Sequence, residues 1–208
     1  MKYKANQSQC LPLLDSHRAT AKKAVEDLLR ALQFDQQGDP NLVDTPNRVS
    51  KMYIDELFSG CYTECPKITA FPNDKGYRSA VFLGPIQVKS VCSHHLLPII
   101  GSAYVTYLPG NQLVGLSKLA RVVQWYMRRP QIQEDLTIQI LDHINSILPD
   151  NRGIAVYIKA THYCVIARGA EETTSAVMTT SAFSGLFDTE STPHRSTFFE
   201  MIRNAHVT

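Results

Sequence analysis

Two short stretches of the chain carry residue types that can bind a metal ion and transfer protons. Cys92 and His95 stand three residues apart, so a turn or short helical segment lets both side chains converge on one ion, while His94 points elsewhere. Zinc sites that do chemistry usually have three protein ligands and an open position for water. The best third ligand is Cys164, which follows His162 in the second stretch. Together the stretches predict a zinc site formed by Cys92, His95 and Cys164.

A structural role is the alternative for the same residues. Buried cysteine often behaves as a small apolar residue, and neighbouring histidines can be hydrogen-bonded in a core or exposed at a surface. The second stretch repeats the combination of histidine and cysteine, which favours the metal site. The five cysteines of the chain form an odd set with uneven spacing, which is typical of reduced thiols rather than a disulfide framework.

Length and composition exclude several classes of protein. The 208 residues are enough for one ordinary domain with an appendage, and 44% hydrophobic with 19% charged residues is typical of a soluble globular protein. The net charge of +2 comes without a basic tract, so no nucleic-acid partner is expected. No apolar run approaches the roughly 18 residues of a membrane helix, and the polar start lacks a signal-peptide core. We therefore expect a cytoplasmic protein without a membrane partner.

The pattern of apolar residues predicts an α+β chain. Helical spacing predicts helices at 16–34, 45–60, 116–128, 131–148 and 193–202. Short runs of β-branched and aromatic residues predict strands at 79–83, 86–92, 99–107 and 154–160, with an edge strand or loop at 173–181. His162 and Cys164 would share one face if the last strand continued through them. We divide the chain into an N-terminal helical region, 1–66, and a catalytic domain, 67–208.

The starts of two predicted helices carry polar residues that have two interpretations. Ser117, Lys118 and Arg121 open one helix, where free backbone N–H groups and basic side chains suit phosphate, although an exposed charged turn explains them equally well. Glu134 in the first turn of the next helix also favours the helix dipole without any ligand. Arg48, one turn into an earlier helix, is most simply a solvated surface residue.

Several motifs in a fixed order resemble the GTP cyclohydrolase I family of zinc enzymes. The similarity runs from about residue 20 to the C-terminus, and it also includes Thr45-Pro46-x-Arg48 and Gly185-Leu186-Phe187. The four principal motifs are Cys92-x-His94-His95-Leu96, Gly115-Leu116-Ser117-Lys118-x-x-Arg121, Arg129-Pro130-Gln131-x-Gln133-Glu134-x-Leu136-Thr137 and His162-Tyr163-Cys164-x-x-x-Arg168-Gly169.

The resemblance implies a fold and an assembly that periodicity alone does not predict. The expected architecture is the tunnelling fold, a four-stranded antiparallel sheet with two long helices on one face, preceded by N-terminal helices. The expected assembly is a toroidal homodecamer in which each active site is built at a subunit interface.

The resemblance also implies the reaction: zinc-dependent hydrolysis of GTP at C8, release of formate, and rearrangement to 7,8-dihydroneopterin triphosphate. Cys92, His95 and Cys164 would hold the zinc that activates water. His162 would protonate the opening ring, and His94 with Ser117 would move protons during the rearrangement. The implied substrate-binding residues are Gln133 and Glu134 for guanine, Arg48, Lys118, Arg121 and Arg168 for the triphosphate, and also Leu116 and Ser117.

The chain departs from the family pattern at a few positions. Ser93 stands where the family usually carries Glu, Val177 stands where Thr is expected, and the stretch before Gly185 is one residue longer. Loss of a carboxylate beside a metal ligand can alter metal affinity or activity. Two alternatives therefore stay open: a cyclohydrolase that acts on another guanine nucleoside or nucleotide, and a catalytically weak zinc-containing binding subunit. The presence of His94, His162 and Glu134 argues against the second.

Overall fold

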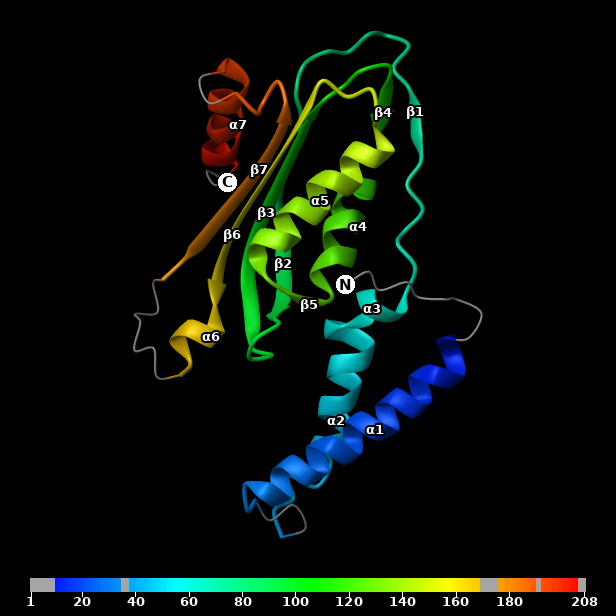
Figure 1. Ribbon diagram of the computed structural model, residues 1–208, viewed down its shortest axis with the longest axis vertical. Coiled ribbons are helices and arrows are strands. Elements are labelled where there is room, and N and C mark those ends of the chain that lie inside the picture. The colour runs from blue at the N-terminus through cyan, green and yellow to red at the C-terminus, as the bar shows by residue number, and fades with distance from the viewer. Residues whose placement is uncertain (1–9, 35–37, 169–175, 190–191, 206–208) are drawn as a thin grey trace. The chain divides into compact units, whose positions relative to one another are not determined.

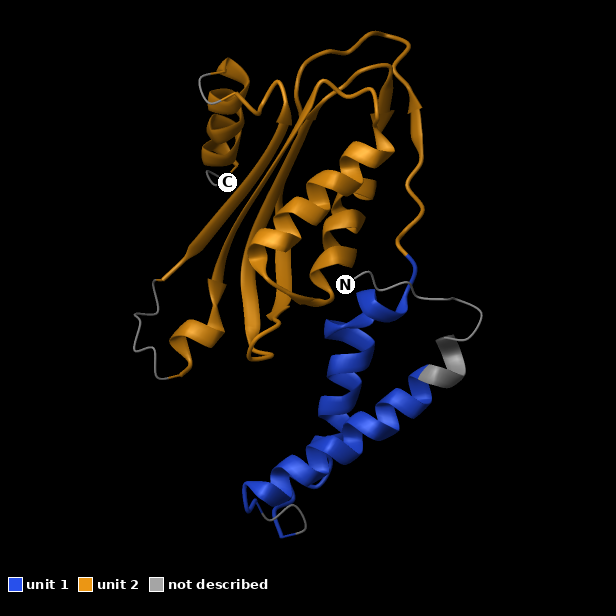
Figure 2. Cartoon of the chain, in the orientation of Figure 1, with its two compact units in different colours: residues 1–64 blue, residues 65–208 orange. Residues whose placement is uncertain are grey.

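A computed structural model describes residues 10–34, 38–168, 176–189 and 192–205, which form an α+β chain of two compact units (Figure 2). The first unit is Met1–Glu64 and the second is Cys65–Thr208. The division therefore falls two residues before the boundary that the sequence suggests.

The first unit is helical. It contains α1 (Cys10–Ala31), α2 (Thr45–Lys51), the π-helix η2 (Met52–Leu57) and α3 (Ser59–Tyr62). The single helix predicted for 45–60 is wrong, because its middle winds more widely: the Phe58 amide donates to the Tyr53 carbonyl, five residues back, at 2.9 Å. Arg18 of α1 pairs with Asp55 of η2 at 2.7 Å.

A five-stranded sheet is the centre of the second unit, with strand order β5-β2-β3-β6-β7 (Figure 1). Its four long strands run antiparallel to their neighbours, and the two-residue β5 lies parallel to β2. The bounds are β2 (Val81–Cys92), β3 (Pro98–Leu108), β5 (Pro130–Gln131), β6 (Gly153–His162) and β7 (Met178–Gly185). A separate pair joins β1 (Ala70–Pro72) to β4 (Gln112–Val114).

Three expectations about the strands need correction. The strands predicted at 79–83 and 86–92 are one strand, β2, in which the pairing register shifts between Leu83 and Ile86. The sheet has five strands instead of four, because the chain between two helices adds β5, which is too short for any periodicity to reveal. The segment predicted at 173–181 is a strand from Met178 to Gly185, and its predicted first residues lie outside the described ranges.

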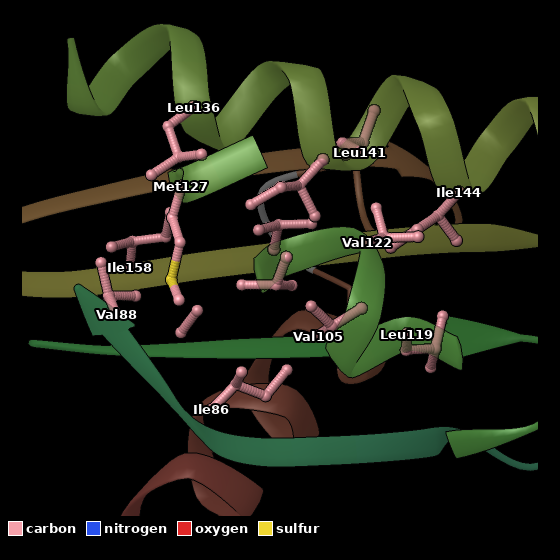
Figure 3. Close-up of a cluster of buried hydrophobic side chains, with 14 of the residues drawn as sticks. Ile86, Val88, Val105, Leu119, Val122, Met127, Leu136, Leu141, Ile144 and Ile158 are labelled. Atoms are coloured by element: carbon pink, nitrogen blue, oxygen red, sulfur yellow. The ribbon is translucent and has the colours of Figure 1, made fainter. Parts of the chain in front are cut away.

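Two helices, α4 (Leu116–Met127) and α5 (Gln133–Ile147), cover one face of this sheet (Figure 1). Side chains alternate along a strand, so every second residue of β3 and β6 faces these helices. Val105 and Ile158 are fully buried there, against Leu136 and other apolar side chains of both helices (Figure 3). The apolar stripes of the two helices thus form the main core.

The opposite face is covered at one end by α7 (Pro193–Asn204), the predicted C-terminal helix. Phe198 and Ile202 of α7 pack on Tyr104 of β3 and Ala155 of β6, residues that alternate with those of the main core. A one-turn helix, α6 (Tyr163–Ile166), follows directly after β6.

Candidate metal centre and active site

The turn after β2 carries the first two candidate ligands. Cys92 is the last residue of the strand. Its amide donates to the Leu97 carbonyl at 2.8 Å, and its carbonyl accepts from the Leu96 amide at 2.9 Å. Leu96 takes a positive φ of 53°, which lets the chain reverse within these few residues. The turn brings His95 back toward Cys92, as their spacing predicts.

Cys164 reaches the same place by a different route from the one predicted. The strand β6 ends at His162 and the chain turns into α6, so His162 and Cys164 do not share a strand face. The register pairs His162 with Ile99 at the start of β3, and β3 begins directly after the Cys92 turn. Strand pairing therefore places α6 beside that turn.

The ligand atoms of Cys92, His95 and Cys164 all lie within 4.8 Å of one another. Around a tetrahedral zinc ion such atoms are about 3.3–3.8 Å apart, so side-chain shifts of about 1 Å suffice to close the site. Both cysteines are buried and the histidine is exposed. Two thiolates and one imidazole are a donor set that zinc takes in catalytic sites, with the fourth position left open. The residues present therefore fit zinc.

The surroundings of Cys164 disfavour its charged thiolate form. Burial raises the pKa of Cys164, and the neighbouring Cys92 thiol raises it further, while Arg168 acts in the opposite direction. Arg168 also donates from Nε to the Cys164 carbonyl at 2.8 Å, which fixes the guanidinium close to α6. A divalent cation reverses this balance, because it stabilises the thiolate form of both cysteines.

His162 is held by the buried side chain of Gln133. Its Nε2 lies 2.8 Å from the amide oxygen of Gln133, the first residue of α5. Burial lowers the pKa of His162, and the carboxylate of Glu134 acts against that shift. Gln133 is 1% exposed, whereas Glu134 is exposed at the surface. In the structure Gln133 thus has His162 as a partner within the protein. Its contact with guanine stays a prediction.

A second group of candidate residues lies at the start of α4. Leu116, Ser117 and Arg121 are exposed, and Lys118 is half-buried. The C-terminal end of α4 lies near Cys92, because Cys92 pairs with Gln131, which follows shortly after that helix ends. The 12 residues of α4 span about 17 Å, so the helix keeps its first turn away from the metal centre of the same chain.

The strands support the same separation. The backbone of Val114, just before α4, bonds the Tyr107 hydroxyl near the end of β3, with its amide donating at 3.1 Å. The Cys92 turn lies at the other end of β3, whose 11 residues span about 35 Å. One chain thus does not bring the start of α4 to the Cys-His-Cys cluster.

Arg48 belongs to the first compact unit, on α2. It is exposed, donates to the Asn41 carbonyl at 2.8 Å and pairs with Asp44 at 3.5 Å. His94 is exposed in the turn after β2, with its ring centroid 6.3 Å from that of His95 and the two planes at 82°.

Sequence reasoning missed two hydroxyl residues near His162. Thr180 of β7 and Thr137 of α5 lie 2.6 Å apart, oxygen to oxygen, and Gln133 donates to Thr180 at 3.1 Å. Thr137 belongs to one of the family motifs, and Thr180 lies in the hydroxyl-rich segment 173–181, which carries no motif residue. The hydroxyl-rich composition of that segment was the one available signal.

No helix in the described part of the chain is both long enough and apolar enough to cross a membrane.

Comparisons with known proteins identify the family of the chain. The family description GTP cyclohydrolase I matches residues 21–203. Similar proteins named GTP cyclohydrolase 1 include that of Edwardsiella ictaluri, 41% identical over 194 residues, with 93% of this chain and 86% of that protein covered. That of Shewanella baltica is 42% identical over 164 residues (78% and 74% covered), and that of Actinobacillus pleuropneumoniae 43% over 174 residues (83% and 78%).

Among solved structures, the archaeosine synthase QueF-Like in the apo form is 16% identical with a TM-score of 0.41, covering 52% of this chain and 94% of that one. That score is too low to indicate a shared fold. The family match, residues 21–203, extends from α1 to α7 and includes Cys92 and His162 at strand ends and Cys164 on α6. The chain belongs to the GTP cyclohydrolase I family.

Proposed function

We propose that this protein hydrolyses GTP at C8, releases formate and rearranges the product to 7,8-dihydroneopterin triphosphate. Membership of the family supports the reaction. The observation that carries the proposal is the Cys92, His95 and Cys164 cluster, with His162 two residues before its last member. We assign the catalytic domain to residues 67–208 and the N-terminal helical region to residues 1–66.

Cys92, His95 and Cys164 would hold zinc, since their atoms converge and their donor types suit that ion. When bound, zinc supplies a Lewis acid that makes water a stronger nucleophile at neutral pH. Burial of the two cysteines keeps bulk water from competing for the ligand atoms.

His162 would act as the proton donor to the purine ring as it opens. Burial lowers the pKa of His162, and the Glu134 carboxylate acts in the opposite direction by favouring the charged imidazolium. Glu134 is exposed on the first turn of α5, where its carboxylate can accept two N–H groups from guanine. Adenine lacks that pair of donors, so the carboxylate discriminates between the two bases. Gln133 would assist in this recognition.

The remaining roles concern the ribose and the triphosphate. His94, with Ser117, would move protons during ribose opening and closure. The basic residues bind the triphosphate through charge-assisted hydrogen bonds, and Leu116 also contacts the substrate. These basic residues are Arg48, Lys118, Arg121 and Arg168.

We propose further that the protein is a homodecamer with the tunnelling fold, in which each active site combines two chains. The separation of Ser117 and Lys118 from the cluster of their own chain supports this arrangement, because the start of α4 from a neighbouring chain could complete the site. The cytoplasmic location stays a prediction from the sequence.

The test is incubation of zinc-replete protein with GTP, following formate release and, after oxidation, pterin fluorescence. We expect both signals together. Formate without pterin would mean ring opening without rearrangement, and would place the defect at His94 and Ser117. Guanosine and GMP are the comparison substrates, since Ser93 stands at a position where the family usually has Glu.

Equal rates with guanosine, GMP and GTP would contradict the triphosphate requirement and support a related cyclohydrolase. Binding of guanine nucleotide without formate from any of the three would contradict the enzymatic role altogether. A His162→Asn variant is the matched control, because it removes the proposed proton donor and leaves all three metal ligands in place.

A further inference from the structure

The side-chain amide of Gln133 has only one orientation that its surroundings allow. Its nitrogen lies 3.2 Å from the Ile158 carbonyl oxygen, 3.3 Å from the Met178 carbonyl oxygen and 3.1 Å from the Thr180 hydroxyl. Two of these neighbours are carbonyls, which only accept hydrogen bonds. Exchanging the amide oxygen and nitrogen would place the amide oxygen against two carbonyl oxygens that cannot donate to it, in a buried site.

Two threonine hydroxyls set the direction of the third contact. Thr137 donates its hydroxyl proton to the Gln133 backbone carbonyl at 2.8 Å. The Thr137 oxygen must then accept the proton of Thr180, 2.6 Å away. Thr180 therefore accepts from the Gln133 amide nitrogen, which again leaves the amide oxygen facing His162.

This arrangement determines which ring nitrogen of His162 carries the proton. The Gln133 oxygen lies 2.8 Å from Nε2 of His162 and can only accept, so Nε2 must donate. In the neutral imidazole the other nitrogen, Nδ1, then has the free lone pair. The contact therefore occupies Nε2 and leaves Nδ1 as the ring nitrogen with an unused lone pair in the neutral form.

We propose that Gln133 and Thr180 are positioning residues for His162, which hold the neutral ring as its Nε2-protonated tautomer and reserve Nδ1 for proton transfer. The catalytic consequence rests on the proposed function, whereas the tautomer follows from the contacts alone. Gln133 therefore acts on the reaction through His162, in addition to any contact with guanine. Thr180, which accepts from the Gln133 amide, lies on β7. The sequence alone indicates no site residue on that strand.

The test is ¹⁵N solid-state NMR of the sedimented, zinc-loaded, full-length protein with labelled histidine, because the two tautomers have different nitrogen signals. The His162→Asn variant assigns the signals by their disappearance. Three further variants are compared: Gln133→Met, which keeps the size and removes the acceptor; Thr180→Val, which removes the hydroxyl; and Thr180→Ser, which retains it. Zinc content and formate release are measured on the same samples.

We expect a single Nε2-protonated signal for His162 in the wild type and in Thr180→Ser. Gln133→Met should show a second population protonated at Nδ1. Formate release should fall about tenfold or more, up to the roughly 10²–10⁴-fold that a positioned acid contributes as a whole. Thr180→Val should change both readouts in the same direction by a smaller amount. Zinc content should stay at the wild-type level in all three.

An Nδ1-protonated wild type, or an unchanged His162 signal in Gln133→Met, would overturn the proposal. If Gln133→Met does not fold, the pair Thr180→Val and Thr180→Ser decides, and identical spectra for the two would contradict it. A wild type that releases no formate would refute the proposed function instead, and the tautomer would still be read from its spectrum.

Discussion

Cys164 is the ligand on which the metal centre depends most, because it comes from a part of the chain distant from Cys92 and His95. We expect Cys164→Ser to abolish stoichiometric zinc, since a hydroxyl is a much poorer zinc ligand than a thiolate. The measurement is metal analysis of purified protein after dialysis. Cys61→Ser, a substitution in the first compact unit, is the matched control and should keep wild-type zinc. Full zinc content in Cys164→Ser would exclude this residue as a ligand.

Ser93 is exposed in the turn between two proposed ligands, and its amide donates to the Gln131 carbonyl at 3.0 Å. The exposed side chain leaves room for a larger residue, so we expect Ser93→Glu to fold normally. A carboxylate beside the ligands should raise zinc affinity or formate release, by up to the 10–100-fold typical of such supporting groups. Ser93→Gln provides the same size without charge. Unchanged zinc affinity and kinetics with every nucleotide would refute the idea.

The helix α5 can be tested through two isoleucines on opposite faces. Ile140 is fully buried in the main core, and Ile138 is 51% exposed. Ile140→Ala should lower the free energy of unfolding by about 2–5 kcal/mol, because it removes buried methylene groups and leaves a cavity. Ile138→Ala should change it by about 0.5 kcal/mol or less. Urea unfolding at matched protein concentration measures both, and equal losses would contradict the packing described.

The contact between α4 and α5 contains a histidine with a shifted pKa. His143 of α5 lies with Nδ1 3.0 Å from the Tyr126 hydroxyl of α4 and with Nε2 3.6 Å from the Cys65 sulfur. Burial lowers the pKa of His143, and the positive charge of Arg129 lowers it further. Both effects favour the neutral ring in the folded state.

The sign of the pH dependence follows from that shift. Below a pH of about 6.5 the unfolded chain protonates this histidine while the folded protein resists it, so the folded state loses stability as the pH falls. We expect the free energy of unfolding to fall less steeply between pH 7.5 and 5.5 in His143→Gln than in the wild type. Denaturation at several pH values measures this, and parallel curves for the two proteins would show that His143 does not contribute.

Assembly of several chains would bring the start of α4 from one chain to the metal centre of another. Light scattering at micromolar concentration should give about ten times the 23.3 kDa of one chain. We also expect co-expression of Cys164→Ser with Lys118→Ala to restore part of the activity that each variant lacks alone. A mixed interface can combine an intact cluster from one chain with an intact start of α4 from the other. A monomer, or mixtures without activity, would contradict an active site built by two chains.

Local spacing in the sequence was sufficient for the features that depend on neighbouring residues. The turn that joins Cys92 to His95 and the two core helices follow from contacts within a few positions of the chain, so their signals are contained in short windows. The helical interpretation of 45–60 failed in its middle, because a π-helix differs from an α-helix by hydrogen bonding and not by composition.

Contacts between distant segments required the folded chain. The turn into α6 after His162, the two-residue β5 and the partners of Gln133 depend on strand register and side-chain packing across many residues. The distance between the start of α4 and the metal centre has the same origin, since helix length and strand pairing set it together. The sequence by itself therefore determined the family and the candidate ligands. Tertiary packing decided which partners hold His162 and which residues one chain can bring together, because those depend on distances that no local pattern contains.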